Sequence, residues 1–252
     1  NIALGFQALA TNTTASNNVA IGKDALLYNT TGTNNVGIGS ASLDANTTGD
    51  NNTGLGTNAL GANTTAEANT AVGVNALLVN TTGAYNTAVG MSSLDANTTG
   101  TRNDALGYQA GTALTTGSYN TFIGERAGSS TTTASENVAV GSASFSANTT
   151  GTACVAIGKN ALAANTTAAN NTAVGKDAMV ANTTGHSGVA IGKDALAANT
   201  TGNYNVAVGV DALTANTTGS ENTAMGIQAM QANTMGAVNV GIGTSVLDAN
   251  TT

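Results

Sequence analysis

Hydrophobic and polar residues recur along the chain with a period of 17 residues, starting at Asn1. The copy from Asn205 to Glu221 reads NVAVGVDALTANTTGSE and represents all of them. Fourteen such copies reach Val238 without an insertion or deletion, and a fifteenth copy, which begins at Asn239, stops three residues short. A fixed short period is typical of stacked units that bury their apolar sides against one another. We therefore predict that residues 1–252 form a single repeat array of fifteen 17-residue units.

The apolar residues keep to fixed positions of the repeat, which we number 1 to 17. Position 4 holds a large aliphatic residue or Met in every copy, and position 9 holds Leu in ten copies. We expect these two positions to form a continuous apolar spine. Positions 1 to 5 usually read Asn, Val or Thr, a small residue, an aliphatic residue and an invariant Gly. This alternation of β-branched and small residues predicts a short strand.

Positions 12 to 15 usually read Asn-Thr-Thr followed by Gly or Ala. Asn and Gly tolerate positive φ angles, and Asn can bond its own backbone, so this stretch predicts a corner. Positions 8 to 11, usually Ala-Leu-x-Ala, are expected to form a second short strand or a tight turn, although their composition alone favours a helix. A coil of this length has no room for a strand, a helix and two loops.

Together these elements predict an all-β protein, a β-solenoid with one coil per 17-residue repeat. The alternative is an array of helical hairpins in which two repeats make one hairpin. Gly at position 5 and Asn-Thr-Thr-Gly at the corner would interrupt each helix every few residues. The pattern therefore favours the β-solenoid.

The charged residues keep to variable positions and give a net charge of −7. Most lie at positions 6, 7 and 10, which marks these positions as solvent-facing. Six basic residues scattered along the chain form no cationic stripe, so nucleic acid is not an expected partner. No apolar stretch approaches the roughly 18 residues that a membrane span needs, so we expect no membrane insertion. No signal peptide is visible, and export signals could lie outside this sequence.

Residues for catalysis or metal binding lack partners in this sequence. His186 is the only histidine, and Cys154, the only cysteine, replaces the usual Asn of position 1. The glycines are spaced by 17 and not by the offsets of a phosphate loop or a nucleophile elbow. We expect His186 to be a surface residue and Cys154 to pack as a small residue. The sequence therefore predicts neither an enzyme nor a bound cofactor or metal.

One acidic column offers an alternative metal site. Asp177, Asp194 and Asp211 are 17 residues apart and are expected to stack on three successive coils. Stacked carboxylates bind calcium in some β-rolls, but the Gly-rich, Asp-bearing nonapeptide of those rolls is absent. Lys176 and Lys193 offset the repulsion more simply, so solvated carboxylates are favoured.

Asparagine recurs at positions 1 and 12, where stacked amides can hydrogen-bond from coil to coil as ladders. We predict structural ladders, and those of position 12 comprise the twelve copies in which Thr-Thr follows: Asn12, Asn29, Asn46, Asn63, Asn80, Asn97, Asn148, Asn165, Asn182, Asn199, Asn216 and Asn250. Each of these is also an N-glycosylation sequon. In a host that glycosylates, one edge of the protein would carry sugars.

Threonine fills position 13 in every copy and position 14 in all copies but one, where Met235 replaces it. Regular threonine columns are also found in ice-binding solenoids. Those proteins present Thr-x-Thr so that both hydroxyls leave the same face of a strand, whereas adjacent threonines point to opposite sides. Ice binding is therefore kept as an alternative and is not favoured.

The seventh and eighth copies depart from the pattern. Position 2 is Asp, position 9 is Gly twice, position 12 loses its Asn twice and position 3 becomes Phe, at Asp104, Gly111, Leu114, Phe122, Gly128 and Thr131. A kink, a change of register or a receptor-binding patch could lie there. Simple drift in a tolerant repeat is the favoured explanation.

The repeat NxAVGxxALxANTTG resembles two related groups of proteins. Asn18–Gly22 (NVAIG), Cys154–Gly158 (CVAIG) and Asn171–Gly175 (NTAVG) are similar to the head repeats of trimeric autotransporter adhesins and to repeats of phage and bacterial tail-fibre-like proteins. The resemblance implies a left-handed parallel β-roll whose chains form a homotrimer. It also implies a fibre that is extracellular, on a cell surface or on a virion. Because the adhesin heads have a period shorter than 17, the corner is expected to be longer here.

These observations lead to a hypothesis of a non-enzymatic structural and adhesive shaft that mediates surface attachment. Its partners would be further copies of the chain and a glycan or protein receptor on a host surface. Two alternatives stay open: a monomeric solenoid that binds ice or glycan, and a rod that polymerises end to end into an extracellular filament.

Overall fold

The computed structural model describes residues 1–251, and it places one three-residue strand in each repeat. The chain divides into two compact units, one covering Asn1–Glu125 and the other beginning at Arg126. The first unit contains β1 (Ile2–Leu4), β2 (Val19–Ile21), β3 (Val36–Ile38), β4 (Thr53–Leu55), β5 (Thr70–Val72), β6 (Thr87–Val89), β7 (Asp104–Leu106) and β8 (Thr121–Ile123). The second contains β9 (Val138–Val140), β10 (Val155–Ile157), β11 (Thr172–Val174), β12 (Val189–Ile191), β13 (Val206–Val208), β14 (Thr223–Met225) and β15 (Val240–Ile242).

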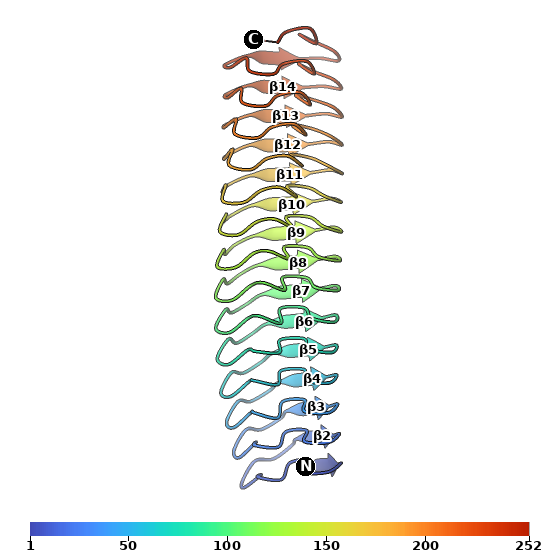
Figure 1. Cartoon of the computed structure of the whole chain (residues 1–252), viewed down its shortest axis with the longest axis vertical. Coiled ribbons are helices and arrows are strands. Elements are labelled where there is room, and N and C mark those ends of the chain that lie inside the picture. Colours follow the sequence, from blue (N-terminus) through green and yellow to red (C-terminus); the bar gives the residue numbers. More distant parts are fainter. Residues whose placement is uncertain (252) are drawn as a thin grey trace. The chain divides into compact units, whose positions relative to one another are not determined.

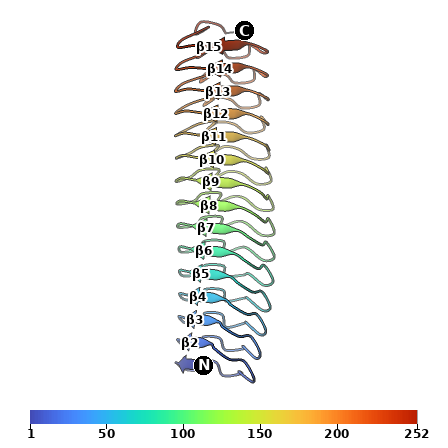
Figure 2. The same ribbon diagram turned by 180° about the vertical axis from the view of Figure 1, so that it is seen from behind.

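Within each unit the strands pair in parallel and in sequence order, and every residue faces its equivalent in the next repeat. In the second unit, Val206 pairs with Thr223, Ala207 with Ala224, and Val208 with Met225. Figures 1 and 2 show the strands of successive coils and the turns that connect them. The prediction of an all-β, parallel β-solenoid with a 17-residue period is confirmed. The helical-hairpin alternative is wrong, because residues 1–251 contain no helix, and hence no helix that could cross a membrane.

The bends of each coil come from left-handed backbone conformations at three fixed positions. Residues at positions 7, 9 and 17 have φ between 48° and 63° in the described copies. Positions 7 and 17 are often Asn or Asp, which adopt this conformation more readily than other non-glycine residues. Positions 8 to 11 form a tight turn and no second strand, with bonds such as that from the Asn29 N–H to the Leu26 carbonyl at 3.2 Å.

The glycine at position 5 is required by its backbone and by the neighbouring coil. Gly22 has φ of +135°, and a Cβ atom there would lie 2.5 Å from the carbonyl oxygen of Gly39. An L-residue would therefore be strained and would also collide with backbone that cannot move independently. The same geometry recurs through each unit, which explains why position 5 never varies.

The core of each coil is made of small residues and one large one. Ala20, Ala25 and Leu26, at positions 3, 8 and 9, are completely buried. The residue at position 4 instead lies on the outer face of the strand, where Leu106 is 49% exposed and Ile191 is 41% exposed. The prediction that positions 4 and 9 share one buried spine is thus wrong for position 4.

The reason for this difference is the thinness of the coil. Side chains alternate across a strand, so either position 3 or positions 2 and 4 can face inward. The Leu of position 9 already fills the space above position 3: a Cβ atom on Gly37 would lie 3.2 Å from Leu26 Cγ. Only a small side chain fits there, and the aliphatic residues are left outside.

Candidate functional surfaces

The asparagines at position 12 form hydrogen-bonded ladders inside the coils. Asn46 Nδ2 donates to Asn29 Oδ1 at 2.7 Å and to the Gly49 carbonyl at 3.0 Å. The same pair of bonds recurs from Asn29 to Asn97 in the first unit and onward from Asn148 in the second. Asn12 was expected in this ladder but is not part of it, because its Oδ1 has no hydrogen-bond partner among the described residues and Asn29 Nδ2 donates to the Gly32 carbonyl. Asn233, which the sequon criterion left out because Met235 follows it, takes part equally. A criterion based on position 12 alone would have included it.

The ladder residues are also closed to glycosylation in the folded chain. Asn46 and Asn182 are completely buried, and their Nδ2 atoms donate both hydrogens within the protein. This nitrogen is the atom that would carry the sugar. The sequons along this column are therefore part of the interior and do not form a sugar-coated edge in this fold.

A second ladder runs along position 1 and uses the backbone. Asn35 N–H donates to Asn18 Oδ1 at 2.8 Å, and Asn35 Nδ2 donates to the Gly49 carbonyl at 2.8 Å. Each Asn of this ladder thus bonds to the preceding repeat through its backbone N–H and to the following repeat through its Oδ1. The backbone N–H groups of Cys154 and Gly188 donate to Oδ1 of the preceding Asn, but these residues have no side-chain amide to extend the ladder.

The buried Cys154 is correspondingly inert. Burial raises the pKa of its thiol to about 11, and its Sγ lies 3.5 Å from the carbonyl oxygens of Thr152 and Ala168. A thiol in this state is almost entirely protonated near neutral pH and is a poor nucleophile.

The two threonines of the corner have different surroundings. At position 13, Thr47 Oγ1 donates to the carbonyl oxygen of Thr64 at 3.0 Å, and its equivalents do the same along each unit. At position 14, Thr48 is exposed. Only one of the two threonine columns therefore offers its hydroxyls to the outside.

The irregular residues of the seventh and eighth copies mostly belong to the core. Gly111, Leu114, Phe122, Gly128 and Thr131 are buried, whereas Asp104 is exposed. Gly111 and Phe122 complement each other, because a Cβ atom on Gly111 would lie 2.7 Å from the Phe122 ring. The large residue has moved from position 9 to position 3 of the next coil. Of the six residues, only Asp104 is placed to meet a ligand.

Loss of Asn at position 12 in these two copies leaves polar atoms without partners. Asn97 Oδ1 and Thr131 Oγ1 are buried and form no hydrogen bond among the described residues. Leu114 occupies the place of the amide that would otherwise donate to Asn97. The ladder of position 12 is therefore interrupted at these coils, and the unpartnered polar atoms reduce the stability there.

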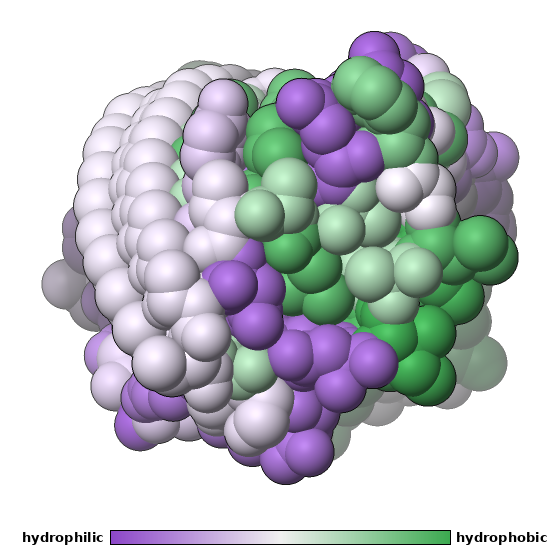
Figure 3. All heavy atoms as spheres, turned by 90° about the horizontal axis from the view of Figure 1, so that it is seen from below, coloured by the Kyte–Doolittle hydropathy of each residue, from purple (hydrophilic) through white to green (hydrophobic). Residues whose placement is uncertain are grey.

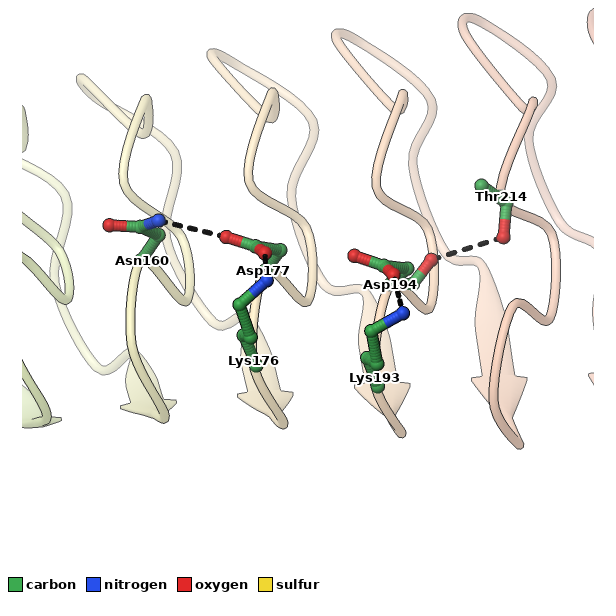
Figure 4. A network of polar contacts seen from close by, with 6 residues as sticks. All are labelled: Asn160, Lys176, Asp177, Lys193, Asp194 and Thr214. Carbon is green, nitrogen blue, oxygen red and sulfur yellow. Dashed lines mark hydrogen bonds and ion pairs between the residues drawn. The ribbon is translucent and has the colours of Figure 1, made fainter.

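Two of the three carboxylates in the acidic column of the second unit, Asp177 and Asp194, pair with lysines. Lys176 Nζ lies 2.5 Å from Asp177 Oδ2, and Lys193 Nζ lies 2.7 Å from Asp194 Oδ2 (Figure 4). The Lys176 bond, together with one from Asn160 Nδ2 at 2.9 Å, holds the pKa of Asp177 below its usual value. No group of three His, Cys, Asp or Glu side chains within residues 1–251 is arranged to hold a metal ion.

His186 lies half-buried at the corner of its coil. Its ring meets the Tyr204 ring edge-on, with the centroids 5.0 Å apart, and its Nδ1 lies 3.4 Å from Ser187 Oγ. No carboxylate bonds to the His186 ring among residues 1–251, so His186 and Ser187 do not make up a catalytic triad.

A further exposed feature is the outer face formed by positions 2 and 4 of the strands, which we call the apolar face because position 4 is always apolar and position 2 is Ile, Val or Thr in every copy but that of Asp104. In β5, β9 and β13 these residues are Thr or Val and Val, and they are half-exposed around a buried Ala. Figure 3, which looks onto the end of the first unit that carries β1, shows apolar residues gathered on one side and residues of intermediate hydropathy opposite. Position 3 is Ala or Gly in every copy but the one with Phe122, and this was the signal in the sequence that positions 2 and 4 face outward.

Comparison of the chain with protein-family models, with curated proteins and with solved structures gives no match. The function therefore has to be argued from the surfaces described above.

Proposed function

We propose that this chain is a non-enzymatic structural and adhesive shaft of an extracellular, cell-surface or virion fibre. In this proposal the solenoid is a left-handed β-roll, and three copies associate as a homotrimer. The shaft holds a binding region away from the surface to which it is attached. The resemblance of the repeat to adhesin-head and tail-fibre repeats supports this proposal.

The observation that carries the proposal is the apolar face. Residues two apart on a strand lie about 7 Å apart and neighbouring strands about 4.8 Å apart, so the eight strands of the first unit present a strip of about 270 Å². A strip of this size approaches the largest apolar patches of soluble monomers, about 300–600 Å², which are often functional. The second unit carries an equivalent strip, which includes Ile157, Ile191 and Met225, each about 40% exposed. Burial against further copies of the chain explains why position 4 keeps its aliphatic residues.

The interior supports a mechanical role. Parallel strands, two amide ladders and the threonine bonds of position 13 tie each coil to the next. No long loop leaves the coils between residues 1 and 251, so few segments are open to a protease. A shaft exposed outside a cell needs this resistance.

Sedimentation equilibrium tests the proposal directly. The expected mass is three times the 24.4 kDa of one chain. Ile191→Lys puts a charge on the apolar face and should shift the mass to that of one chain, with an unchanged circular dichroism spectrum. Thr201→Lys, at the exposed position 14 of the same coil, is the matched control and should remain trimeric.

Two other results would overturn the trimer. A monomeric mass for the unaltered chain would favour a solitary solenoid that binds ice or glycan. A mass that grows steadily with concentration would favour end-to-end polymerisation into a filament.

A further inference from the structure

Three large side chains stand on successive coils of the first unit at position 17: Tyr85, Arg102 and Tyr119. The Arg102 Cζ atom lies 5.5 Å from the centroid of the Tyr85 ring and 5.6 Å from that of the Tyr119 ring. The earlier copies of the first unit have only Asn or Ala at this position, at Asn17, Asn34, Asn51 and Ala68. We call these three residues the Tyr-Arg-Tyr stack.

The stack is held by the regular backbone of the coils. All three residues have φ between 56° and 60°. The Arg102 N–H donates to the Ala84 carbonyl at 3.1 Å, and the Tyr119 N–H donates to the Thr101 carbonyl at 3.0 Å. The side chains therefore start from fixed points one coil apart, which lowers the entropy cost of presenting them together to a ligand.

The rings also position the guanidinium group. A cation between two aromatic faces gains about 0.5–1 kcal/mol from each at an exposed site. Tyr85 Oη donates to Glu67 Oε1 at 2.8 Å, which fixes that ring and engages the one carboxylate that bonds to the stack. Arg102 itself forms no ion pair among residues 1–251, and its side-chain hydrogen bond is a long one, 3.5 Å from Nη1 to Tyr119 Oη.

Arg102 thus keeps most of its five N–H donors turned to the outside, in a chain whose net charge is −7. A planar guanidinium group matches a carboxylate by two parallel hydrogen bonds. Tyr85 and Tyr119 are 49% and 56% exposed, so parts of both rings are free to touch a ligand. Asp104, also exposed, lies two residues after Arg102 at the start of the next coil, and its negative charge limits the site to a ligand whose own negative charge is compact.

We propose that the Tyr-Arg-Tyr stack binds a carboxylate-bearing sugar of an acidic glycan. Arg102 receives the carboxylate at its outward edge, and the exposed parts of the tyrosine rings pack against the C–H groups of the sugar ring. The electron-rich ring faces and the weakly positive C–H groups are complementary. The inference rests on the adhesive role proposed above and gives that role a ligand class, but it does not require the trimer.

The test is the binding of the unaltered chain to oligomers of galacturonic acid and of sialic acid, measured by isothermal titration calorimetry, with neutral dextran as the comparison. Binding to at least one acidic oligomer and none to dextran is expected. Arg102→Gln should weaken that binding about tenfold or more, because the charged hydrogen bonds are lost. Arg102→Lys should also weaken it, since lysine keeps the charge and loses the paired geometry, and Tyr85→Ala should weaken it several-fold.

Lys23→Gln is the matched control, because Lys23 is an exposed cation of the same unit that pairs with Asp24 at 3.6 Å. It removes the same charge and should leave the affinity unchanged. Equal losses in Lys23→Gln and Arg102→Gln would overturn the proposal in favour of unspecific charge attraction. Equal binding of a polyaspartate peptide would overturn it in favour of an acidic protein partner, and no binding to either acidic oligomer would also overturn it.

The sedimentation experiment separates this inference from the proposed function. A trimer that binds neither acidic oligomer would refute glycan binding by the Tyr-Arg-Tyr stack without contradicting the trimeric shaft. A monomer that binds an acidic oligomer through Arg102 would refute the trimeric shaft and support glycan binding by the Tyr-Arg-Tyr stack.

Discussion

Glycine at position 5 illustrates how one residue is fixed by the coil that follows it. Gly192 has φ of +140°, and a side chain there would meet the Gly209 carbonyl. Position 15 is also glycine in most copies, yet Ala15, Ala66, Ala134 and Ala168 show that it accepts a methyl group. A Cβ atom on Gly185 would lie 2.5 Å from the Gly202 carbonyl oxygen, so a close approach of the next coil is common to both positions. The difference lies in the backbone angle, because position 15 has no left-handed φ.

Gly192→Ala is therefore expected to destabilise the second unit by about 3 kcal/mol or more, from strain and collision together. Gly185→Ala, at position 15 of the preceding coil, should cost about 1 kcal/mol or less, since other copies carry Ala there. Urea unfolding followed by circular dichroism measures both. Similar losses in the two variants would show that the backbone angle is not the cause.

The exchange of large and small residues between Gly111 and Phe122 predicts a coupling between them. Phe122→Ala should cost about 3–5 kcal/mol, because it empties a completely buried site. Gly111→Leu should cost about 1–3 kcal/mol by overpacking against the ring. The double variant restores the usual Leu and Ala, so its loss should be smaller than the sum of the two single losses. Strictly additive losses in urea unfolding would contradict the contact.

At the scale of the elements, the ladder of position 12 shows how buried amides stabilise the coils in addition to the apolar core. Asn182 Nδ2 donates to Asn165 Oδ1 and to the Gly185 carbonyl, and its Oδ1 accepts from Asn199 Nδ2 at 2.9 Å. Stacked amides satisfy one another only if every copy places the same residue at the same height. This requirement explains why the period contains no insertion or deletion.

Asn182→Asp keeps the shape of the side chain and removes both donated hydrogens when the carboxyl group is ionised. Burial and the facing oxygen atoms should raise its pKa in the folded state above that in the unfolded state. The variant should therefore be most stable below the unfolded value of about 4 and lose stability as the pH rises through the folded value. Urea unfolding at pH 4 and pH 7 measures this.

Asn203→Asp is the control for that experiment. Asn203 Oδ1 accepts the His186 N–H at 2.9 Å, and Asp50 accepts the equivalent bond in the first unit. An aspartate is thus already accommodated at position 16, and this variant should show little dependence on pH over the same range. A pH-independent Asn182→Asp variant would count against the ladder as a source of stability.

At the scale of the whole molecule, each described coil within a unit contacts its neighbours through equivalent residues. Val189 pairs with Val206 and Val206 pairs with Thr223, always 17 residues apart. Stability in such an array is approximately a sum over coils and their interfaces. Whole repeats should therefore be removable, and fractions of a repeat should not.

Deletion of Asn205–Glu221 joins Tyr204 to Asn222 and places β12 next to β14 in the same register. This variant should keep a cooperative unfolding transition and the circular dichroism of the parent. Deletion of Asn205–Ala212 removes part of one repeat, puts Leu213 directly after Tyr204 and breaks the register of both ladders. It should lose the transition of the second unit; an intact transition would refute the dependence on register.

The sequence by itself determined the period, the place of the strand and the parallel stacking, whereas the positive φ angles expected at positions 12 to 15 lie instead at positions 5, 7, 9 and 17. These features depend on constraints within one repeat and on the identity of neighbouring repeats, both of which are written in the chain. The recurrence of Asn12 and Asn29 at one position is enough to indicate that their equivalents lie above one another, and Asn46 and Asn29 do bond to each other.

Only the tertiary structure decided which side of the strand faces inward. Hydrophobicity favours burial of Ile191 over Ala190, yet Ala190 is completely buried and Ile191 is exposed. The choice depends on the room left inside a thin coil by the leucine of position 9, and that room is a property of the folded coil. The pairing of Gly111 with Phe122 and the stacking of Arg102 between two tyrosines could not be predicted from the sequence either, because both depend on distances between coils.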